Sequence, residues 1–447
     1  MRVAVIFDHL GPYHRARLQA AARRVELKAI ELAGASADYP WARPNDNEAT
    51  FEAATLFEKS VSSQVRLRRL ASALESALTK TRPEAVLIPG WSSPAALSAL
   101  RWCWRKNVPP VVMSESTESD EPRRWCKERV KRRLVSLCPT ALVGGKPQRD
   151  YLRKLGMPFD RVFLGYDAVD NDYFANRTAE VRRQPATFRS QSRLPETYFL
   201  ASARSVEKKN LPRLLQAYAR YRDLHRTSTA PELQKPLHSQ LSTLNLTVLP
   251  HQPSTSPWSL VLLGDGPLRN SAPERSDVPL RNSLNAQLST LNLQSSVHLP
   301  GFKQYDELPA YYGLAGAFVH ASTTEQWGLV VNEAMASGLP VLVSNRCGCA
   351  PDLVQEGRNG FTFAPLNVDE LAGLMLKLAA MPREQLADMG NAGREIISHW
   401  GPERFAAGLR QAVELALRLP RPRPTALDRM LLWTLARRKN WLHRNLQ

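Results

Sequence analysis

The sequence lacks long apolar runs, and it holds few cysteines for its 447 residues. A helix needs about 18 consecutive apolar residues to span a bilayer, and no stretch of this chain approaches that length. The opening apolar run, VAVIF, is too short for a secretory signal peptide, and no cleavage-like group of small residues follows it. We therefore expect a cytoplasmic protein without a membrane-spanning helix.

The cysteines number five, and their spacing is typical of neither a disulfide framework nor a zinc finger. Cys347 and Cys349 stand two positions apart, but no second pair of cysteine or histidine residues accompanies them. We expect no bound metal and no cofactor. The other three are Cys103, Cys126 and Cys138.

Acidic residues are fewer than basic ones, with 42 Asp and Glu against 60 Lys and Arg, which gives a formal net charge of +18. This excess predicts an anionic partner. The densest basic run, RRWCKERVKRR at 123–133, is either a solvated helix face or a contact with an anionic membrane surface. The basic tail at 419–447 has similar alternatives: it lies on a membrane or caps the fold.

The chain is too long for one ordinary core, so two domains are expected. Short, buried, apolar strands alternate with helical patterns in the first half, which predicts a parallel sheet with helices on both faces. The expected strands there are 2–7, 85–90, 109–114 and 140–145, with helices at 15–25, 94–104 and 148–156.

The same alternation restarts after a polar stretch, 177–195, which we interpret as a linker. Ligands of such sheets bind beyond the carboxyl ends of the strands. A Ser-, Thr- and Leu-rich insertion is expected at about 226–257, and its QLSTLNL at 240–246 recurs at 287–293. The expected strands of the second series are 198–203, 259–264, 296–301, 317–322 and 340–344.

Two cations follow the 198–203 strand, where a ligand of the second sheet would bind. Arg204 supplies a fork of donors that suits phosphate oxygens, and Lys209 adds a mobile point charge. Together they could neutralise a diphosphate without a metal; the alternative is two surface cations at the start of a helix. The nearby Gly264-Asp265-Gly266 is a weak nucleotide signal and is interpreted as a tight turn.

Two carboxylates mark the segment TTEQWGLVVNEAMASGLPVLVS at 323–344. Glu325 and Glu333 lie eight positions apart with Gly328 between them, at the entrance of a short helix that ends at Gly338. Helix N-termini attract anions, so the acids either complement the helix dipole or hold the hydroxyls of a sugar nucleotide beside a phosphate site.

Taken together, these motifs resemble the retaining glycosyltransferases of family 4, which have the GT-B fold. The resemblance rests on Arg204 and Lys209, the GDGP turn, LPGFKQYDELPAYYGLAGAFVHAS and the EAMASGLPVLVS segment. GYDAVDNDYF at 165–174 resembles the interdomain segment of that family. The expected fold class is therefore α/β, with two doubly wound Rossmann-like domains facing an interdomain cleft.

The resemblance also implies domain limits. They are an acceptor domain at 1–176, a linker at 177–195, a nucleotide-sugar domain at 196–400, a helix crossing back at 401–418 and a basic tail at 419–447.

The resemblance further implies residue roles. Arg204 and Lys209 would bind and stabilise the leaving diphosphate, and Glu325 would hold hydroxyls of the transferred sugar. Glu333 would hold the ribose, and the amides around Gly328 and Leu329 would contact phosphate and sugar. In the first domain, Gly11 would let the backbone approach the diphosphate. Retention is generally explained in this family by front-face attack, so Glu325 is not assigned as a nucleophile, although a double displacement stays an alternative.

This sequence departs from the family pattern on the acceptor side, because IPGWSSP at 88–94 lacks the usual histidine. His9 and His14 are loop histidines that could face the cleft. The triplet Asp170-Asn171-Asp172 is interpreted as structural rather than as a metal site.

Three functions stay open at this point: a glycosyltransferase acting on a sugar or lipid-linked acceptor, a nucleotide-sugar 2-epimerase, and a non-catalytic basic module. The last explains the charge but not the co-occurrence of the two cations and two acids. The expected partners are a nucleotide sugar, an unidentified sugar or lipid-linked acceptor and an anionic membrane surface touched from the cytoplasmic side, without nucleic acid.

Overall fold

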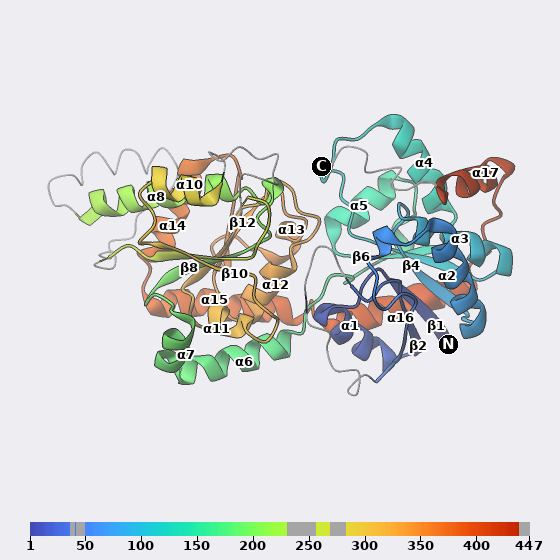
Figure 1. The fold of residues 1–447 in the computed structure, drawn as a ribbon, viewed down its shortest axis with the longest axis horizontal. Coiled ribbons are helices and arrows are strands. Elements are labelled where there is room, and N and C mark those ends of the chain that lie inside the picture. Colours follow the sequence, from blue (N-terminus) through green and yellow to red (C-terminus); the bar gives the residue numbers. More distant parts are fainter. Residues whose placement is uncertain (36–40, 42–49, 230–255, 269–282, 438–447) are drawn as a thin grey trace. The chain divides into compact units, whose positions relative to one another are not determined.

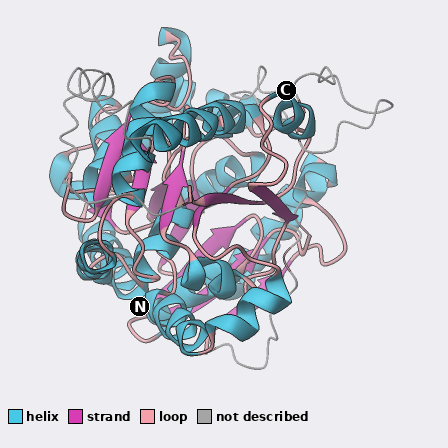
Figure 2. Ribbon diagram, turned by 90° about the vertical axis from the view of Figure 1, so that its left-hand side faces the viewer, coloured by secondary structure: helices cyan, strands magenta, loops and turns pink. Residues whose placement is uncertain are grey.

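The computed structural model describes residues 1–35, 41, 50–229, 256–268 and 283–437. The chain forms two compact units. The first contains Met1–Asp170 and Trp400–Gln447, and the second contains Asn171–His399. Each unit holds one sheet with helices packed on it (Figures 1 and 2). No described helix combines the length and the apolar character that crossing a membrane requires.

The first unit contains a seven-stranded parallel sheet, in the order β3-β2-β1-β4-β5-β6-β7. Its central strands are short, apolar and almost wholly buried, as strands covered on both faces must be. The strands are β1 Arg2–Phe7, β2 Glu26–Glu31, β3 Glu52–Thr55, β4 Ala85–Pro89, β5 Pro110–Ser114, β6 Thr140–Val143 and β7 Val162–Leu164.

Two hydrophobic clusters cover the two faces of this sheet. One cluster includes side chains of α2, α3, α4, α5 and α17, and the other includes those of α1 and α16. The unit is therefore doubly wound. Its α-helices are α1 Pro12–Ala22, α2 Leu67–Thr81, α3 Pro94–Lys106, α4 Trp125–Ser136, α5 Lys146–Lys154, α16 Pro402–Arg418 and α17 Ala426–Leu435; Ser62–Gln64 and Phe159–Arg161 are 3₁₀ turns.

The second unit contains a six-stranded parallel sheet, in the order β10-β9-β8-β11-β12-β13. Its strands are β8 Tyr198–Ser202, β9 Ser259–Leu263, β10 Val297–Gly301, β11 Ala317–His320, β12 Val341–Ser344 and β13 Gly360–Phe363. Its helices are α6 Asn171–Arg183, α7 Pro185–Ser192, α8 Leu211–Thr229, α10 Leu284–Thr290, α11 Leu308–Leu314, α12 Leu329–Ala336, α13 Ala350–Leu353, α14 Val368–Ala379 and α15 Arg383–Ser398, with a 3₁₀ turn at Glu207–Lys209.

The polar stretch 177–195, expected as a linker, is largely helical and lies in α6 and α7. Phe174, Thr178 and Val181 share one face of α6 and are buried. A Cβ added at Gly313 of α11 would lie 2.9 Å from Cγ1 of Val181, so the two helices pack closely. The polar residues of this stretch are the solvent face of a packed helix rather than a flexible connection.

The low-complexity insertion expected at 226–257 lies almost wholly outside the described residues, apart from the end of α8 and the start of the next described segment. The second copy of its repeat is described. That copy lies in and just after α10, where Leu288 and Leu293 are buried in the core of the second unit. The copy of the motif at 287–293 therefore belongs to the folded part of the second unit.

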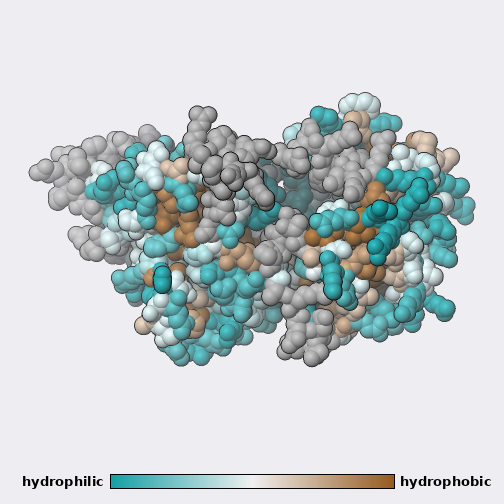
Figure 3. Space-filling model, in the orientation of Figure 1, coloured by the Kyte–Doolittle hydropathy of each residue, from teal (hydrophilic) through white to brown (hydrophobic). Residues whose placement is uncertain are grey.

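Hydrophilic side chains cover much of the described surface on the face drawn in Figure 3, and hydrophobic ones gather in small patches between them. Several large apolar side chains are nevertheless exposed in the first unit, and Trp125 at the start of α4 is the most exposed of them, at 77%. A single exposed apolar side chain is common, so Trp125 gains meaning only together with its neighbours.

Candidate functional site

The loop after β8 places Arg204 and Lys209 at the carboxyl end of the second sheet. Lys209 ends a 3₁₀ turn, and the next residue, Asn210, takes the left-handed conformation with φ 58°. The buried side-chain amide of Asn210 donates to the carbonyls of Ala321 (3.1 Å) and Pro365 (2.7 Å). Asn tolerates this conformation better than most residues, so Asn210 anchors the loop that carries Lys209.

The glycines of the GDG turn allow the loop after β9 to lie directly against the backbone beside Arg204. A Cβ on Gly264 would lie 2.1 Å from the carbonyl oxygen of Ala203, and one on Gly266 would lie 2.8 Å from that of Ser205. Ser205 N–H donates to the Asp265 carbonyl at 2.9 Å. Close approach, rather than a tight turn alone, is the reason for glycine here.

The ammonium of Lys209 forms an ion pair with Oε2 of Glu325, and both side chains are about six-sevenths buried, with exposed fractions of 13% and 15%. Two further groups lie beside the same oxygen. Nε2 of His320 is 3.3 Å from it and the hydroxyl of Ser322 is 3.4 Å from it. The structure therefore brings together the predicted Lys209 and Glu325, 116 positions apart, and adds His320 and Ser322. We call these four residues the Glu325 cluster.

Electrostatics keep Glu325 ionised. Burial raises the pKa of its carboxyl group, but the charge of Lys209 and the contact with His320 outweigh burial, so the pKa lies well below its usual range. For His320, which is 2% exposed, the effect of burial on the pKa is the larger one. Burial and Lys209 lower its pKa more than Glu325 raises it, which favours a neutral imidazole.

Gly328 and Leu329 lie next to this cluster at the start of α12. Gly328 caps the helix with φ 108°, and a Cβ there would lie 3.5 Å from Cγ of Glu325 and 3.6 Å from Nε2 of His320. Leu329 is the first residue of the helix, so its N–H lies in the first turn, where amides have no partner one turn earlier in the helix. The N–H of Val331 donates to the carbonyl of Gly328 at 2.9 Å. The predicted amides therefore lie beside the predicted carboxylate.

Glu333 points into the core of the second unit. It is fully buried in α12, and its Oε2 accepts a hydrogen bond of 2.6 Å from the hydroxyl of Tyr312. Burial raises the pKa of Tyr312, and the charge of Glu333 raises it further. A role of Glu333 at the ribose stays a prediction.

Gly11 belongs to the first unit, where it caps α1 in extended backbone conformation. Its N–H donates to Nδ1 of His14 at 3.1 Å, and a Cβ there would make ordinary contact with Trp41. Nδ1 of His9 lies 3.0 Å from Oε1 of Glu31. Contact of Gly11 with a diphosphate stays a prediction.

The triplet at 170–172 leads into α6, where Asn171 donates to the carbonyl of Ile397 at 2.7 Å. No group of three or more His, Cys, Asp and Glu side chains within the described ranges is arranged to hold a metal ion.

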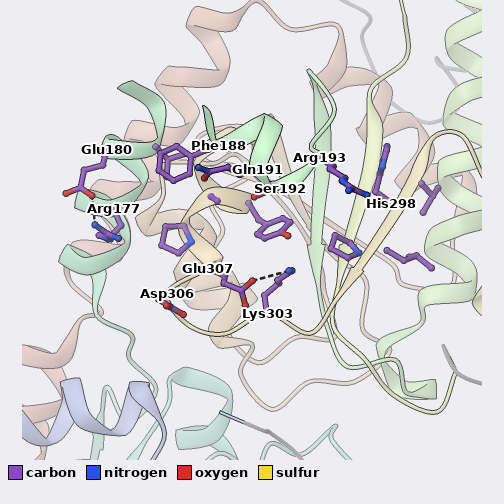
Figure 4. A pocket seen from close by; sticks show the side chains of 17 residues that line it. Arg177, Glu180, Phe188, Gln191, Ser192, Arg193, His298, Lys303, Asp306 and Glu307 are labelled. Carbon is purple, nitrogen blue, oxygen red and sulfur yellow. Dashed lines mark hydrogen bonds and ion pairs between the residues drawn. The ribbon is translucent and has the colours of Figure 1, made fainter. Parts of the chain in front are cut away.

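A separate cavity of about 720 Å³ lies between α6, α7, β10 and α11 (Figure 4). It shares no residue with the Glu325 cluster. Two of its charged pairs are satisfied locally, because Arg177 bonds Glu180 at 2.6 Å and Lys303 bonds Glu307 at 3.1 Å. We take the Glu325 cluster rather than this larger cavity as the candidate site, since charges from separate loops converge there beyond the carboxyl ends of parallel strands.

Comparison with known families matches the part of the chain that contains Glu325, His320 and Ser322, whereas Arg204 and Lys209 lie before the matched region. Residues 240–396 match the family described as "Glycosyl transferases group 1". Over 98 residues the chain is 43% identical to the sulfoquinovosyl transferase SQD2 of Arabidopsis thaliana. The aligned region is 21% of this chain and 19% of that protein.

A second relative is the GDP-mannose-dependent alpha-(1-6)-phosphatidylinositol monomannoside mannosyltransferase of Mycobacterium tuberculosis (strain CDC 1551 / Oshkosh). It is 36% identical over 112 residues, which is 23% of this chain and 29% of that protein. The chain thus matches less than a third of the length of either relative.

The fold extends much further than the sequence match. The crystal structure of HepE from Anabaena, in complex with UDP and glucose, aligns with a TM-score of 0.62 at 15% identity. The alignment covers 92% of this chain and 98% of that one. Together with the two parallel sheets, this likeness confirms the predicted α/β fold of GT-B type, with two Rossmann-like units.

Proposed function

We propose that this protein is a retaining glycosyltransferase that moves a sugar from a nucleotide-activated donor to an acceptor. The observation that carries the proposal is the Glu325 cluster. It joins a cation that can neutralise a diphosphate to a carboxylate that can accept hydrogen bonds from sugar hydroxyls. The matched family and the GT-B fold support the same reaction class.

In the proposed mechanism, the bond between the anomeric carbon of the sugar and the diphosphate breaks. Arg204 and Lys209 stabilise the negative charge that grows on the diphosphate as it leaves. The amides at Gly328 and Leu329 add hydrogen-bond donors at the entrance of α12. The acceptor hydroxyl attacks from the face that the diphosphate leaves, and the departing phosphate takes its proton. With these cations in place, we expect no metal requirement.

Glu325 would bind the donor sugar through its second oxygen. The hydrogen bonds of its side chain to other described residues all end on Oε2. Oε1 is therefore left to accept from hydroxyl groups of the sugar. The names of the matched proteins indicate UDP-linked and GDP-linked sugars as first candidates for the donor.

A lipid-linked acceptor, reached from the surface of an anionic membrane, fits the first unit. Arg124, which precedes α4, and Arg129 and Arg132 on α4 are exposed near Trp125. Helix α17 adds exposed Leu427, Met430 and Trp433, and Arg133 of α4 is 3.2 Å from Asp428 of α17. Basic and apolar side chains together suit the headgroup region of a bilayer.

The competing functions differ in their products. Transfer yields a glycoside and a free nucleoside diphosphate, whereas a 2-epimerase returns a nucleotide sugar. The test is to incubate the protein with a panel of UDP- and GDP-sugars, with and without lipid acceptors, and to measure diphosphate release and the anomeric configuration of the product. Release with a retained configuration supports the proposal. An intact, epimerised nucleotide sugar, or oligonucleotide binding without any turnover, contradicts it.

A further inference from the structure

His320 occupies a position in the Glu325 cluster for which the proposed mechanism has no use. It ends β11, is 2% exposed, and lies with its Nε2 3.3 Å from both Oε2 of Glu325 and the hydroxyl of Ser322. A buried imidazole beside a carboxylate can act as a neutral hydrogen-bonding group or as a cation.

The balance of charges around His320 favours a neutral imidazole in the ligand-free protein. Glu325 is already offset by Lys209, and a second cation beside Lys209 would add repulsion in a buried site. The groups facing His320 come from three loops. They are Lys209 and Glu325, with Cys349 near Gly328, since its Sγ and the His320 Nε2 would each lie 3.6 Å from a Cβ on that glycine. The Phe318 ring belongs to the same strand as His320, and Ser322 follows two residues after the strand ends.

A bound nucleoside diphosphate changes this balance. It brings at least two negative charges toward Lys209, and the ammonium then forms bonds with phosphate oxygens that offset its charge. The repulsion between Lys209 and His320 then falls. The attraction between Lys209 and the carboxylate of Glu325 also weakens, because the ammonium is shared with the phosphate. Both changes favour an imidazolium at His320.

We propose that His320 is a positioning residue that takes up one proton from solution when a nucleoside diphosphate engages Lys209. The imidazolium then donates to Oε2 of Glu325 and holds the carboxylate ionised, with Oε1 directed at the sugar. This inference rests on the proposed function, because it requires Lys209 to bind the diphosphate.

The first test uses the unmodified protein with UDP and with GDP. Calorimetric titration in buffers of different ionisation enthalpy gives the number of protons exchanged on binding. The titration is done between pH 7 and 8.5, above the second phosphate pKa of about 6. We expect net uptake of protons on binding. The affinity should fall by up to about tenfold for each unit of rising pH, in the range where His320 is protonated in the complex but not in the free protein. An affinity independent of pH, with no uptake, overturns the inference.

The second test assigns the proton to His320. His320→Gln keeps a nitrogen that can donate to Glu325 but cannot titrate, so we expect UDP binding within about tenfold of the unmodified protein and no proton uptake. His298→Gln is the matched control, since His298 is a half-buried histidine of β10 in the same unit, and it should keep the uptake. Equal uptake in both variants overturns the inference.

The outcome also separates the two proposals. If UDP and GDP bind and depend on Lys209 but no proton is taken up, this inference is wrong and the proposed function stands. If neither nucleotide binds, the proposed function fails and the inference fails with it.

Discussion

At the scale of single residues, the proposed function depends on one buried ion pair between distant parts of the chain. Sequence reasoning predicted Arg204, Lys209 and Glu325 because their chemistry suits a diphosphate and a sugar, and the structure brings Lys209 and Glu325 together. The binding roles of all three stay predictions. Sequence reasoning missed His320 and Ser322, whose contacts with Glu325 depend on tertiary packing. The available signal was weak: both are polar residues at the end of an apolar strand, and such strand ends form ligand sites in parallel sheets.

Glu325→Gln tests whether this ion pair stabilises the fold. The substitution leaves the ammonium of Lys209 without its carboxylate, so the free energy of unfolding at pH 7 should fall by about 1–3 kcal/mol. Because the pKa of Glu325 is depressed in the folded protein, its stabilising contribution is present above the unfolded-state pKa of about 4.3. That contribution is lost as the pH falls toward the folded-state pKa.

The measurement is thermal or denaturant unfolding of the unmodified protein and the variant from pH 3 to 8. The difference between them should be constant above about pH 5 and shrink below about pH 4. Glu196→Gln, at an exposed glutamate in the loop before β8, is the control and should unfold like the unmodified protein. A difference independent of pH would show that the ion pair is not its source.

At the scale of elements, continuous apolar runs were sufficient to predict most strands. Strands that are very short or that carry charged residues were not predicted. Strands β1, β4 and β12 were expected from continuous apolar residues, and the structure confirms them. Strand β2, ELKAIE, carries charges in its pattern, and β7 has only three residues. Their pairing comes from neighbours in the sheet, which local sequence does not specify.

Helix α6 was missed for a similar reason, because its few buried residues are spread along a polar segment. Gly313→Ala in α11 tests the packing that orders it. The added methyl group would lie 2.9 Å from Cγ1 of Val181, and overpacking of this kind costs about 1–3 kcal/mol. We expect a lower melting temperature, measured by calorimetry.

Gly393→Ala in α15 is the matched control, since the nearest atoms to its added Cβ lie at 3.8 Å, an ordinary contact. It should not lower the melting temperature. Combining Gly313→Ala with Val181→Ala should restore much of the loss. If Gly313→Ala were as stable as the control, α6 would not pack on α11 as described here.

At the scale of the whole molecule, we attribute the excess of positive charge to the proposed anionic partners rather than to the fold. The Glu325 cluster uses only one cation, and exposed arginines on α4 lie beside exposed aromatic and aliphatic side chains. The sequence predicted both an anionic donor and an anionic surface from the same charge, since net charge does not distinguish them.

Vesicle binding tests the surface. Replacing Arg124, Arg129 and Arg132 with Glu should lower binding to anionic phospholipid vesicles on the order of 10²-fold or more, because each basic residue contributes about 1 kcal/mol. Sedimentation with vesicles at low and high salt measures the effect. Replacing Arg226, Arg358 and Arg383, exposed in the second unit, changes the net charge equally and should have a much smaller effect. Equal losses, or equal binding to neutral vesicles, would contradict a specific surface.

The most direct test of the central claim is nucleoside diphosphate release from the preferred nucleotide sugar by Lys209→Ala, with Lys208→Ala as the control. Lys208 is the exposed neighbour, and its side chain has no contact with Glu325 among those described. Loss of a preorganised charge at the leaving group predicts a fall in kcat on the order of 10²-fold or more for Lys209→Ala, and near-normal turnover for Lys208→Ala. Near-normal turnover by both variants would contradict the claim that this cluster holds an activated sugar.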